Sequence, residues 1–342
     1  MQPLAAILGF VLLAAAAMAD PRPSTAIINR TCSAFTVTYA YPSYDYCVTV
    51  LSTSDPASAA AAKDGHGLAI IAANATAHDV RHTVDSVIDL SYVLSRCSEF
   101  YERDMADKVT SALGDIVAGR NPRDKFLDAY YLGPGNCHIL INQKWGYSKD
   151  LLLEENSDNM ALTLLARNIA RLIPNFHKSS NSTPPSPAAI INATCSSLSY
   201  NLYRGYNYCV GVLSSDPSAA ASARNTRDLA IIAANAISHN ITSTVRLIQG
   251  LLSDLDYCKV SYNRMGSTVE NALGDLIAGQ APAGAANKLD DAAKDAISCD
   301  VVMSKRRGAA KNVLQQENEQ NFVSAHFASN IALLPVGSTT NP

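Results

Sequence analysis

The sequence lacks the local signatures of the common enzyme classes. It contains no Gly-x-Ser-x-Gly nucleophile elbow, no His-Glu-x-x-His zinc motif, no phosphate-binding Walker loop and no Gly-x-Gly-x-x-Gly opening a helix after a strand. We therefore expect neither catalysis by this chain nor a bound cofactor.

An excess of positive charge is also missing. The chain has 27 Lys and Arg residues against 30 Asp and Glu residues, a formal net charge of −3. It has no basic patch and no interleaving of basic with aromatic residues, which are the usual marks of a nucleic-acid-binding surface. The cluster Ser-Lys-Arg-Arg-Gly at residues 304–308 is too short to argue otherwise. We expect no nucleic-acid partner.

Long hydrophobic runs are absent after the first twenty residues. The apolar run from Leu4 to Ala17, followed by Ala-Met-Ala at residues 17–19, is typical of a secretory signal peptide, residues 1–19. A membrane anchor is the alternative, but the run is short for a bilayer, which needs about 20 residues. We expect a secreted protein with no membrane association after cleavage.

Two long stretches of the chain are related. Leu-Ala-Ile-Ile-Ala-Ala-Asn-Ala occurs at residues 68–75 and again at 229–236, and Ala-Leu-Gly-Asp at residue 112 returns at residue 272. Matches spread over a whole half-chain indicate a duplicated domain of about 150 residues, a usual domain size. The sequence thus predicts domain 1 at residues 25–175, a Pro/Ser-rich linker at 176–188 and domain 2 at 189–336.

The eight cysteines fall four to each copy at matched spacing. In a secreted chain such a set predicts disulfides. Zinc is the alternative, but the chain has no Cys-x-x-Cys pair and no cysteine–histidine cluster at ligand spacing. Four cysteines allow three pairings per copy, among which spacing alone does not choose. The predicted disulfide cysteines are Cys32, Cys47, Cys97, Cys137, Cys195, Cys209, Cys258 and Cys299.

Five Asn-x-Ser/Thr sequons predict N-glycosylation in a secreted chain. The predicted acceptors are Asn29, Asn74, Asn181, Asn192 and Asn240.

A metal site is not expected. His78 and His82 lie four residues apart on a predicted helix, but the second copy keeps only His239 and has Ser243 in the place of His82. A solvated helix face explains the pair better than a metal site.

The remaining pattern is helical. Asp55-Pro56 and Asp216-Pro217 place an N-cap acceptor before a proline at the first helical position. An apolar stripe at three-to-four spacing follows in the first copy: Leu68, Ile71, Ala72, Ala75, Val84, Val87 and Ile88. A second helix carries Cys97 and ends at Gly119, a third ends near Cys137, and a fourth covers residues 159–172. We predict an all-α fold of two tandem four-helix up-and-down bundles, each with an N-terminal disulfide-closed helical hairpin.

Each copy resembles the plant invertase/pectin methylesterase inhibitor family. The resemblance rests on the four-cysteine frame, on an Ile-Ile-x-x-Thr-Cys start, on Tyr-x-Tyr-Cys-Val-x-x-Leu-Ser at residues 44–52 and 206–214, and on the Asp-Pro that follows. It covers nearly the whole mature chain. It implies a four-helix bundle with a helical hairpin, disulfides joining the first cysteine to the second and the third to the fourth, and binding that blocks the cleft of a cell-wall enzyme.

The resemblance also implies contact residues. Invertase inhibitors of the family use a Pro-Lys-Phe turn before the third helix, and here that position reads Asp124, Lys125 and Phe126. The second copy has Asn-Lys-Leu at residues 287–289. The run before the fourth cysteine departs from the family pattern, because Gly-Pro-Gly at residues 133–135 predicts an early helix end.

The sequence therefore predicts a secreted, apoplastic protein inhibitor whose partner is an acid invertase or a pectin methylesterase. The alternative is a diverged, non-inhibitory binding or structural glycoprotein on the same bundle.

Overall fold

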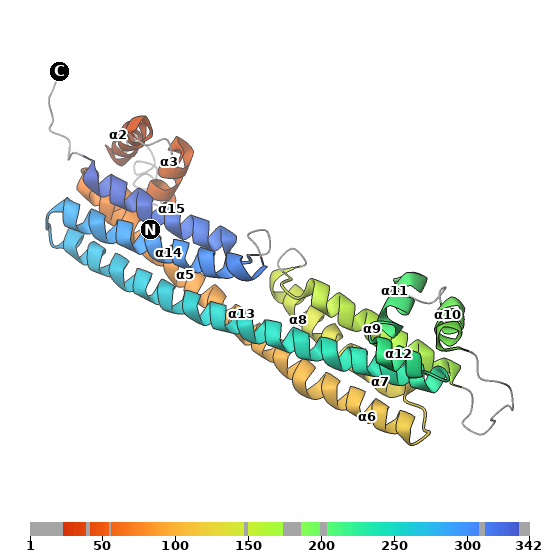
Figure 1. The fold of residues 1–342 in the computed structure, drawn as a ribbon. Helices are drawn as coiled ribbons and strands as arrows, with labels where there is room; N and C mark the ends of the chain where they lie inside the picture. Colours follow the sequence, from red (N-terminus) through yellow and green to blue (C-terminus); the bar gives the residue numbers. More distant parts are fainter. Residues whose placement is uncertain are drawn as a thin grey trace, which may run out of the picture. The chain divides into compact units, whose positions relative to one another are not determined.

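The computed structural model describes residues 23–38, 42–54, 56–146, 150–173, 186–198, 204–307 and 312–334. Throughout this part of the chain every regular element is a helix, which confirms the predicted all-α class (Figure 1). The predicted signal peptide and residues 176–185 of the predicted linker lie outside the described residues.

The helices follow the two sequence copies. Those of the first copy are α2 (Pro23–Thr38), α3 (Tyr44–Thr53), α4 (Pro56–Ala61), α5 (Gly65–Glu99), η2 (Phe100–Met105), α6 (Ala106–Val117), α7 (Arg123–Tyr130), η3 (Tyr131–Gly135), α8 (Asn136–Trp145) and α9 (Leu153–Leu172). Those of the second copy are α10 (Pro187–Leu198), α11 (Gly205–Leu213), α12 (Pro217–Ser222), α13 (Thr226–Ile277), α14 (Pro282–Arg307) and α15 (Gln315–Leu333).

The first two bundle helices expected in each copy are one continuous helix. In the second copy α13 runs unbroken over 52 residues, and in the first copy α5, η2 and α6 follow one another without a turn (Figure 1). The prediction of a connection between them was therefore wrong. In the first copy residues 68–113 contain neither Gly nor Pro, so nothing in that stretch ends a helix. In the second copy α13 contains no Pro, and its isolated glycines, such as Gly250 and Gly266, lower helix propensity without ending the helix.

The apolar stripe that includes Leu-Ala-Ile-Ile-Ala-Ala-Asn-Ala is a core face, as predicted. Leu68, Ile71 and Val87 are each at most 1% exposed. Ile88 is the exception, because it is 44% exposed although it continues the stripe.

The chain forms two compact units, and each unit combines parts of both sequence copies. Unit 1 comprises residues 1–88 and 256–342, and unit 2 comprises residues 89–255. The predicted ranges 25–175 and 189–336 remain the prediction for the two copies of the duplication, but the compact units are divided differently.

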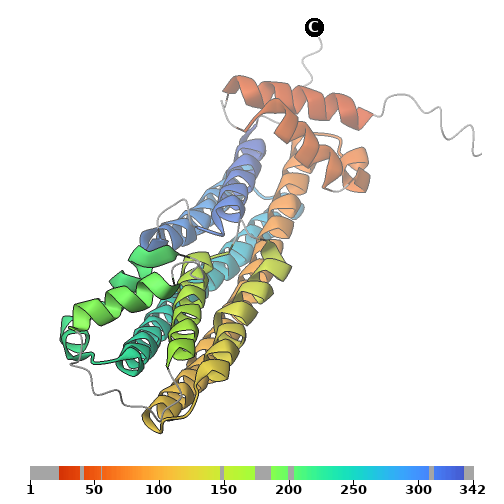
Figure 2. The same cartoon turned by 90° about the vertical axis from the view of Figure 1, so that its right-hand side faces the viewer.

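Unit 1 is a four-helix bundle with a hairpin at one end. Its long helices are the first part of α5, the last part of α13, α14 and α15. The hairpin of α2 and α3 lies against α15 (Figures 1 and 2). Phe35 of the hairpin meets Phe327 edge-on, with ring centroids 5.2 Å apart.

Unit 2 repeats this plan with the complementary segments. Its long helices are the last part of α5 with η2 and α6, then α7 with η3 and α8, then α9, and the first part of α13. The hairpin of α10 and α11 contacts α9. Asp216 caps α12 as predicted, because its carboxylate accepts the backbone N–H groups of Ser218 and Ala219 at 2.9 and 3.0 Å.

Four disulfides are formed, and each stays within one sequence copy. They are Cys32–Cys47, Cys97–Cys137, Cys195–Cys209 and Cys258–Cys299. This is the pairing that the resemblance implied, and it closes both hairpins as predicted.

Two π-helical turns occur in the first copy. Tyr101 and Ala112 are eleven positions apart, whereas the equivalent Tyr262 and Ala272 are ten apart. The extra residue falls where the chain forms η2, and the second copy is plain α-helix there. A single inserted residue is thus absorbed as one wide turn.

The second π turn, η3, contains the Gly-Pro-Gly segment. Here too the first copy has one more residue, since Lys125 and Cys137 are twelve apart and Lys288 and Cys299 eleven. The helix continues through η3 into α8, so the predicted early end at this segment was wrong. In a π turn the backbone hydrogen bonds are shifted by one residue from the α-helical pattern. This shift accommodates Pro134, which has no N–H group to donate, inside the helix.

Candidate functional site

The turn between α6 and α7 carries the residues that the resemblance pointed to. Gly119, at φ +74°, ends α6 in a left-handed conformation that suits glycine. Its N–H donates to the carbonyl of Ile116 at 3.2 Å, and the N–H of Arg120 donates to the carbonyl of Asp115 at 2.7 Å. This paired C-cap brings the start of α7 back beside the end of α6.

A carboxylate held by two cations lies at this turn. The Nζ of Lys125 is 2.6 Å from Oδ2 of Asp115, and the Nε of Arg120 donates to Oδ1 of Asp115 at 2.7 Å. Lys125 also donates to the Oγ of Ser111 at 2.6 Å. The hydrogen bonds from Lys125 and Arg120 hold the pKa of Asp115 below its ordinary value. Asp115 is therefore a positioning group for both cations.

The three predicted contact residues differ in exposure. Phe126 is fully buried and packs in the bundle core, so it cannot itself touch a partner. Asp124 is exposed, and the side chain of Lys125 is 34% exposed. Only Asp124 and Lys125 therefore reach solvent, with Phe126 anchoring the start of α7 beneath them.

Two further residues of the turn were missed by sequence reasoning. Val117, the last residue of α6, is 69% exposed, and the side chain of Arg120 is 66% exposed. The signal for both was their position on either side of a C-cap glycine, where side chains point to solvent. We call Val117, Arg120, Asp124 and Lys125 together the turn surface.

Unit 1 has the same turn with less charge. Gly279, at φ +69°, ends α13, and the exposed Ile277 stands in the place of Val117. Lys288 pairs with Asp275 at 2.6 Å, as Lys125 does with Asp115. Gln280 replaces Arg120, so this turn has one cation fewer.

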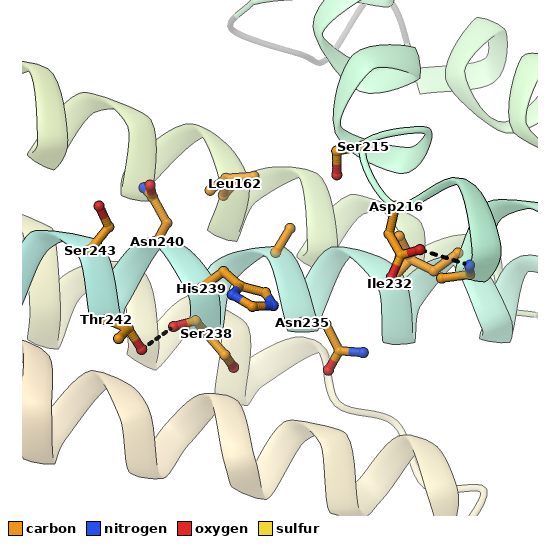
Figure 3. A pocket seen from close by; sticks show the side chains of 12 residues that line it. Leu162, Ser215, Asp216, Ile232, Asn235, Ser238, His239, Asn240, Thr242 and Ser243 are labelled. Carbon is orange, nitrogen blue, oxygen red and sulfur yellow. Dashed lines mark hydrogen bonds between the residues drawn. The ribbon is translucent and has the colours of Figure 1, made fainter.

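A cavity lies in unit 2, beside α13 and the start of α12. It holds about 680 Å³. Figure 3 shows Asp216 and His239 at its wall, with Leu162 of α9 and Asn240 on the other side. The carboxylate of Asp216 is the cap of α12, and hydrogen bonds from the Ser218 hydroxyl and the backbone amides of Ala219 and Ser218 lower its pKa.

The predicted glycosylation residues lie in different surroundings. The exposed acceptors are Asn29, Asn74 and Asn192. Asn240 lines the cavity of unit 2, and its Nδ2 is buried. Asn181 lies outside the described residues. Glycosylation at these sequons stays a prediction.

Among the residues described, no group of three His, Cys, Asp or Glu side chains is placed to hold a metal ion. The His78 side chain is 77% exposed, as a solvated helix face requires. None of the helices in the described ranges combines the length and the apolar character needed to cross a bilayer.

Comparison with protein families gives a match in the second copy. Residues 189–334 match the model of the plant invertase/pectin methylesterase inhibitor family. The match supports the inhibitor family for the second copy and covers less than half of the chain. No curated protein and no solved structure matches the sequence.

Proposed function

We propose that this protein is a secreted inhibitor that binds a plant cell-wall carbohydrate-acting enzyme, an acid invertase or a pectin methylesterase, and blocks its cleft. The observation that carries the proposal is the family match of residues 189–334. The first copy shares the same pairing of four cysteines and the same hairpin, which extends the proposal to the whole chain.

Export to the apoplast fits the chemistry of the chain. All eight cysteines are in disulfides, which persist in oxidising compartments and are rare in the cytosol. The apolar run at residues 4–17 and the five sequons agree with passage through the secretory route.

The turn surface is the proposed contact with the target. It combines one exposed apolar side chain, Val117, with charged groups whose positions are fixed by Asp115. A rigid, preorganised contact loses little conformational entropy on binding, and this favours tight association. Lys125 is its centre, because it is held at both Asp115 and Ser111 while a third of its side chain stays exposed.

The proposal is tested by titrating the oxidised protein against an acid invertase and a pectin methylesterase and measuring residual activity of each. Saturating inhibition of one enzyme is expected, and the equivalence point gives the number of working copies. If neither enzyme is inhibited at acidic or neutral pH, the non-inhibitory binding glycoprotein becomes the better account.

The role of Lys125 is tested by Lys125→Ala, with Lys288→Ala as the matched variant in the other turn. If the first turn binds the target, Lys125→Ala weakens inhibition by about tenfold or more, as loss of a central interface cation does. Thermal unfolding is the control, and the transition should stay cooperative with only a small loss of stability, since Arg120 still pairs with Asp115. Equal inhibition by the wild type and Lys125→Ala would remove the first turn from the contact.

A further inference from the structure

Each compact unit is closed by contacts between the two sequence copies. In unit 1 the first half of copy one, up to Ile88, packs against the second half of copy two. In unit 2 the second half of copy one packs against the first half of copy two. The two copies are related, so each first half has two candidate partners within the chain, its own second half and that of the other copy.

Some buried contacts do not distinguish these partners. Asn321 donates to the Oγ of Thr83 in unit 1, and Asn159 donates to that of Thr244 in unit 2, at 2.6 and 3.0 Å. Both copies hold the same residue types at these positions. These bonds therefore hold either pairing equally well.

Residues that differ between the copies do distinguish them. Ser324 of α15 donates to Oδ2 of Asp79 at 2.7 Å, and its Oγ lies 3.0 Å from the hydroxyl of Tyr46. The equivalent of Ser324 in the first copy is Leu162. If copy one paired with itself, Asp79 and Tyr46 would face a leucine, and a partly buried carboxylate without a donor is costly.

The hairpins give the same preference. Phe35 and Tyr46 both meet Phe327 edge-on, at 5.2 and 5.7 Å between centroids. The equivalents of Phe35 and Phe327 are Leu198 and Leu165, which are both buried in unit 2. The exchanged pairing thus gives Phe35 an aromatic partner, where pairing within copy one would offer it Leu165, and aromatic pairs stabilise beyond their buried area.

A charge pair also joins the copies in unit 2. Arg204, at the start of α11, lies 2.5 Å from Oδ1 of Asp158 in α9 and donates to Ser157 at 3.1 Å. In the second copy Gln320 takes the place of Asp158, but Glu319 takes the place of Ser157. Either last helix therefore offers Arg204 a carboxylate, and this pair does not choose between the partners.

One position opposes the pattern. Asn240 is the equivalent of Asp79, and its buried Nδ2 has no hydrogen-bond partner beside Leu162. Pairing within the second copy would offer it Ser324. A neutral amide without a partner costs less than a carboxylate without one, so the balance still favours exchange.

We propose that the two sequence copies are reciprocal binding partners, in which the first half of each recognises the second half of the other through these differing residues. This inference is independent of the proposed function. On this proposal, the connection at residues 176–188 is not needed to hold the copies together. No disulfide joins the copies, so only non-covalent contacts hold them once that connection is cut.

The test uses the full mature chain with a specific protease site placed within residues 178–184. After cutting, the two fragments are expected to elute together, at the volume of the uncut chain, in non-denaturing size exclusion. Separation into two half-size species would overturn the proposal.

A cross-link identifies the partner directly. The variant Arg204→Lys with Gln320→Glu offers the new lysine Asp158 on the first copy and position 320, beside the native Glu319, on the second. A zero-length carbodiimide forms an amide between lysine and carboxylate with loss of water. Coupling to Asp158 joins the cut fragments on a denaturing gel, whereas coupling to position 319 or 320 leaves them separate and overturns the proposal. Joined fragments found only in a species of twice the size would overturn pairing within one chain.

Matched substitutions test the specificity. Ser324→Leu gives α15 the residue of the first copy and is expected to weaken association of the cut fragments by roughly tenfold, because Asp79 loses its donor. Leu162→Ser, at the equivalent place, is expected to weaken association less than Ser324→Leu does, because a hydroxyl can accept from Asn240 and so offsets part of the apolar burial that is lost with Leu162. Equal effects of the two substitutions would contradict the assignment of Ser324 as a selective contact.

Discussion

The segment from Cys97 to Cys137 and its counterpart from Cys258 to Cys299 form equivalent helix pairs on different backbones. The first segment contains the two π turns, η2 and η3, whereas the two helices of the second segment, α13 and α14, are entirely α-helical. Contacts on both sides of the π turns are nevertheless kept. Tyr101 donates to Asn156 at 2.7 Å, and Tyr262 donates to Asn318 in the same way.

The comparison shows how a bundle absorbs an insertion. An extra residue in a regular helix would rotate everything after it by about 100° relative to the core. A π turn confines that rotation to one turn, so Cys97, before η2, still reaches Cys137, after η3, as Cys258 reaches Cys299. The two π turns also pack together, because Gly133 lies directly on Met105.

The disulfides set the scale of the largest expected effect. Removing Cys97–Cys137 by a double Ala substitution should lower the free energy of unfolding by about 4 kcal/mol, since the bond closes a loop 40 residues long. Removing Cys258–Cys299 should cost the same, because that loop is 41 residues long. Denaturant unfolding measures both. A clearly smaller loss for the first pair would mean that its π turns already carry strain which the bond maintains.

The packing of the two π turns is tested by Gly133→Ala. The new Cβ would come within 2.8 Å of the Cβ of Met105, so the backbones must move apart. We expect a loss of about 1–3 kcal/mol, as for other overpacked cores. The matched control is Gly114→Ala in α6, where a Cβ meets nothing within 4 Å and a gain of roughly 0.4–1 kcal/mol is expected. Thermal unfolding that is equal for both would contradict the close contact.

The smallest expected effect concerns the two lysine–aspartate pairs and depends on pH. Because Lys125 and Arg120 lower the pKa of Asp115, this residue stabilises the fold above its unfolded pKa, near 3.9, and the stabilisation is lost as the pH falls through the lower folded pKa. The stability difference between wild type and Asp115→Asn should therefore be largest near neutral pH and should shrink below about pH 4. Thermal unfolding at pH 7 and pH 3 measures it.

The matched variant for this prediction is Asp275→Asn. Asp275 meets the single cation Lys288, and its side chain is 19% exposed against 7% for Asp115. The loss of thermal stability caused by Asp275→Asn at neutral pH should therefore be smaller than the loss caused by Asp115→Asn. A larger loss for Asp275→Asn would show that the second cation at Asp115 adds nothing.

Local features were predictable from the sequence, and the pairing of distant segments was not. The hairpins, the cap at Asp216 and the core stripe follow from spacing and side-chain chemistry within a few residues. The insertions were visible as well, because Ala112 and Ala272 are offset by one position less than Cys97 and Cys258. The continuous helices could have been inferred from the absence of Gly and Pro between residues 68 and 113.

The exchange between copies and the exposure of the site could not be read in that way. Thr83 and Thr244 are the same residue in the same pattern, so periodicity cannot say which asparagine each one meets. Only positions that differ between the copies, such as Leu162 and Ser324, distinguish the two pairings. Their effect on pairing is evident only when the residues that they contact are known. Phe126 was missed as a core residue because three residues of a turn do not show which one points inward.

The division of the units also fixes an order of events during synthesis. Unit 2 is contiguous, so its last helix emerges soon after the others and the bundle can close by itself. Unit 1 needs α15, some 240 residues after Ile88. At ribosomal rates of about 5–20 residues per second, its first helices wait on the order of 10–50 s for their partner. For that time the apolar face of α5 is without its final cover, and transiently exposed apolar surface of this kind is prone to aggregate.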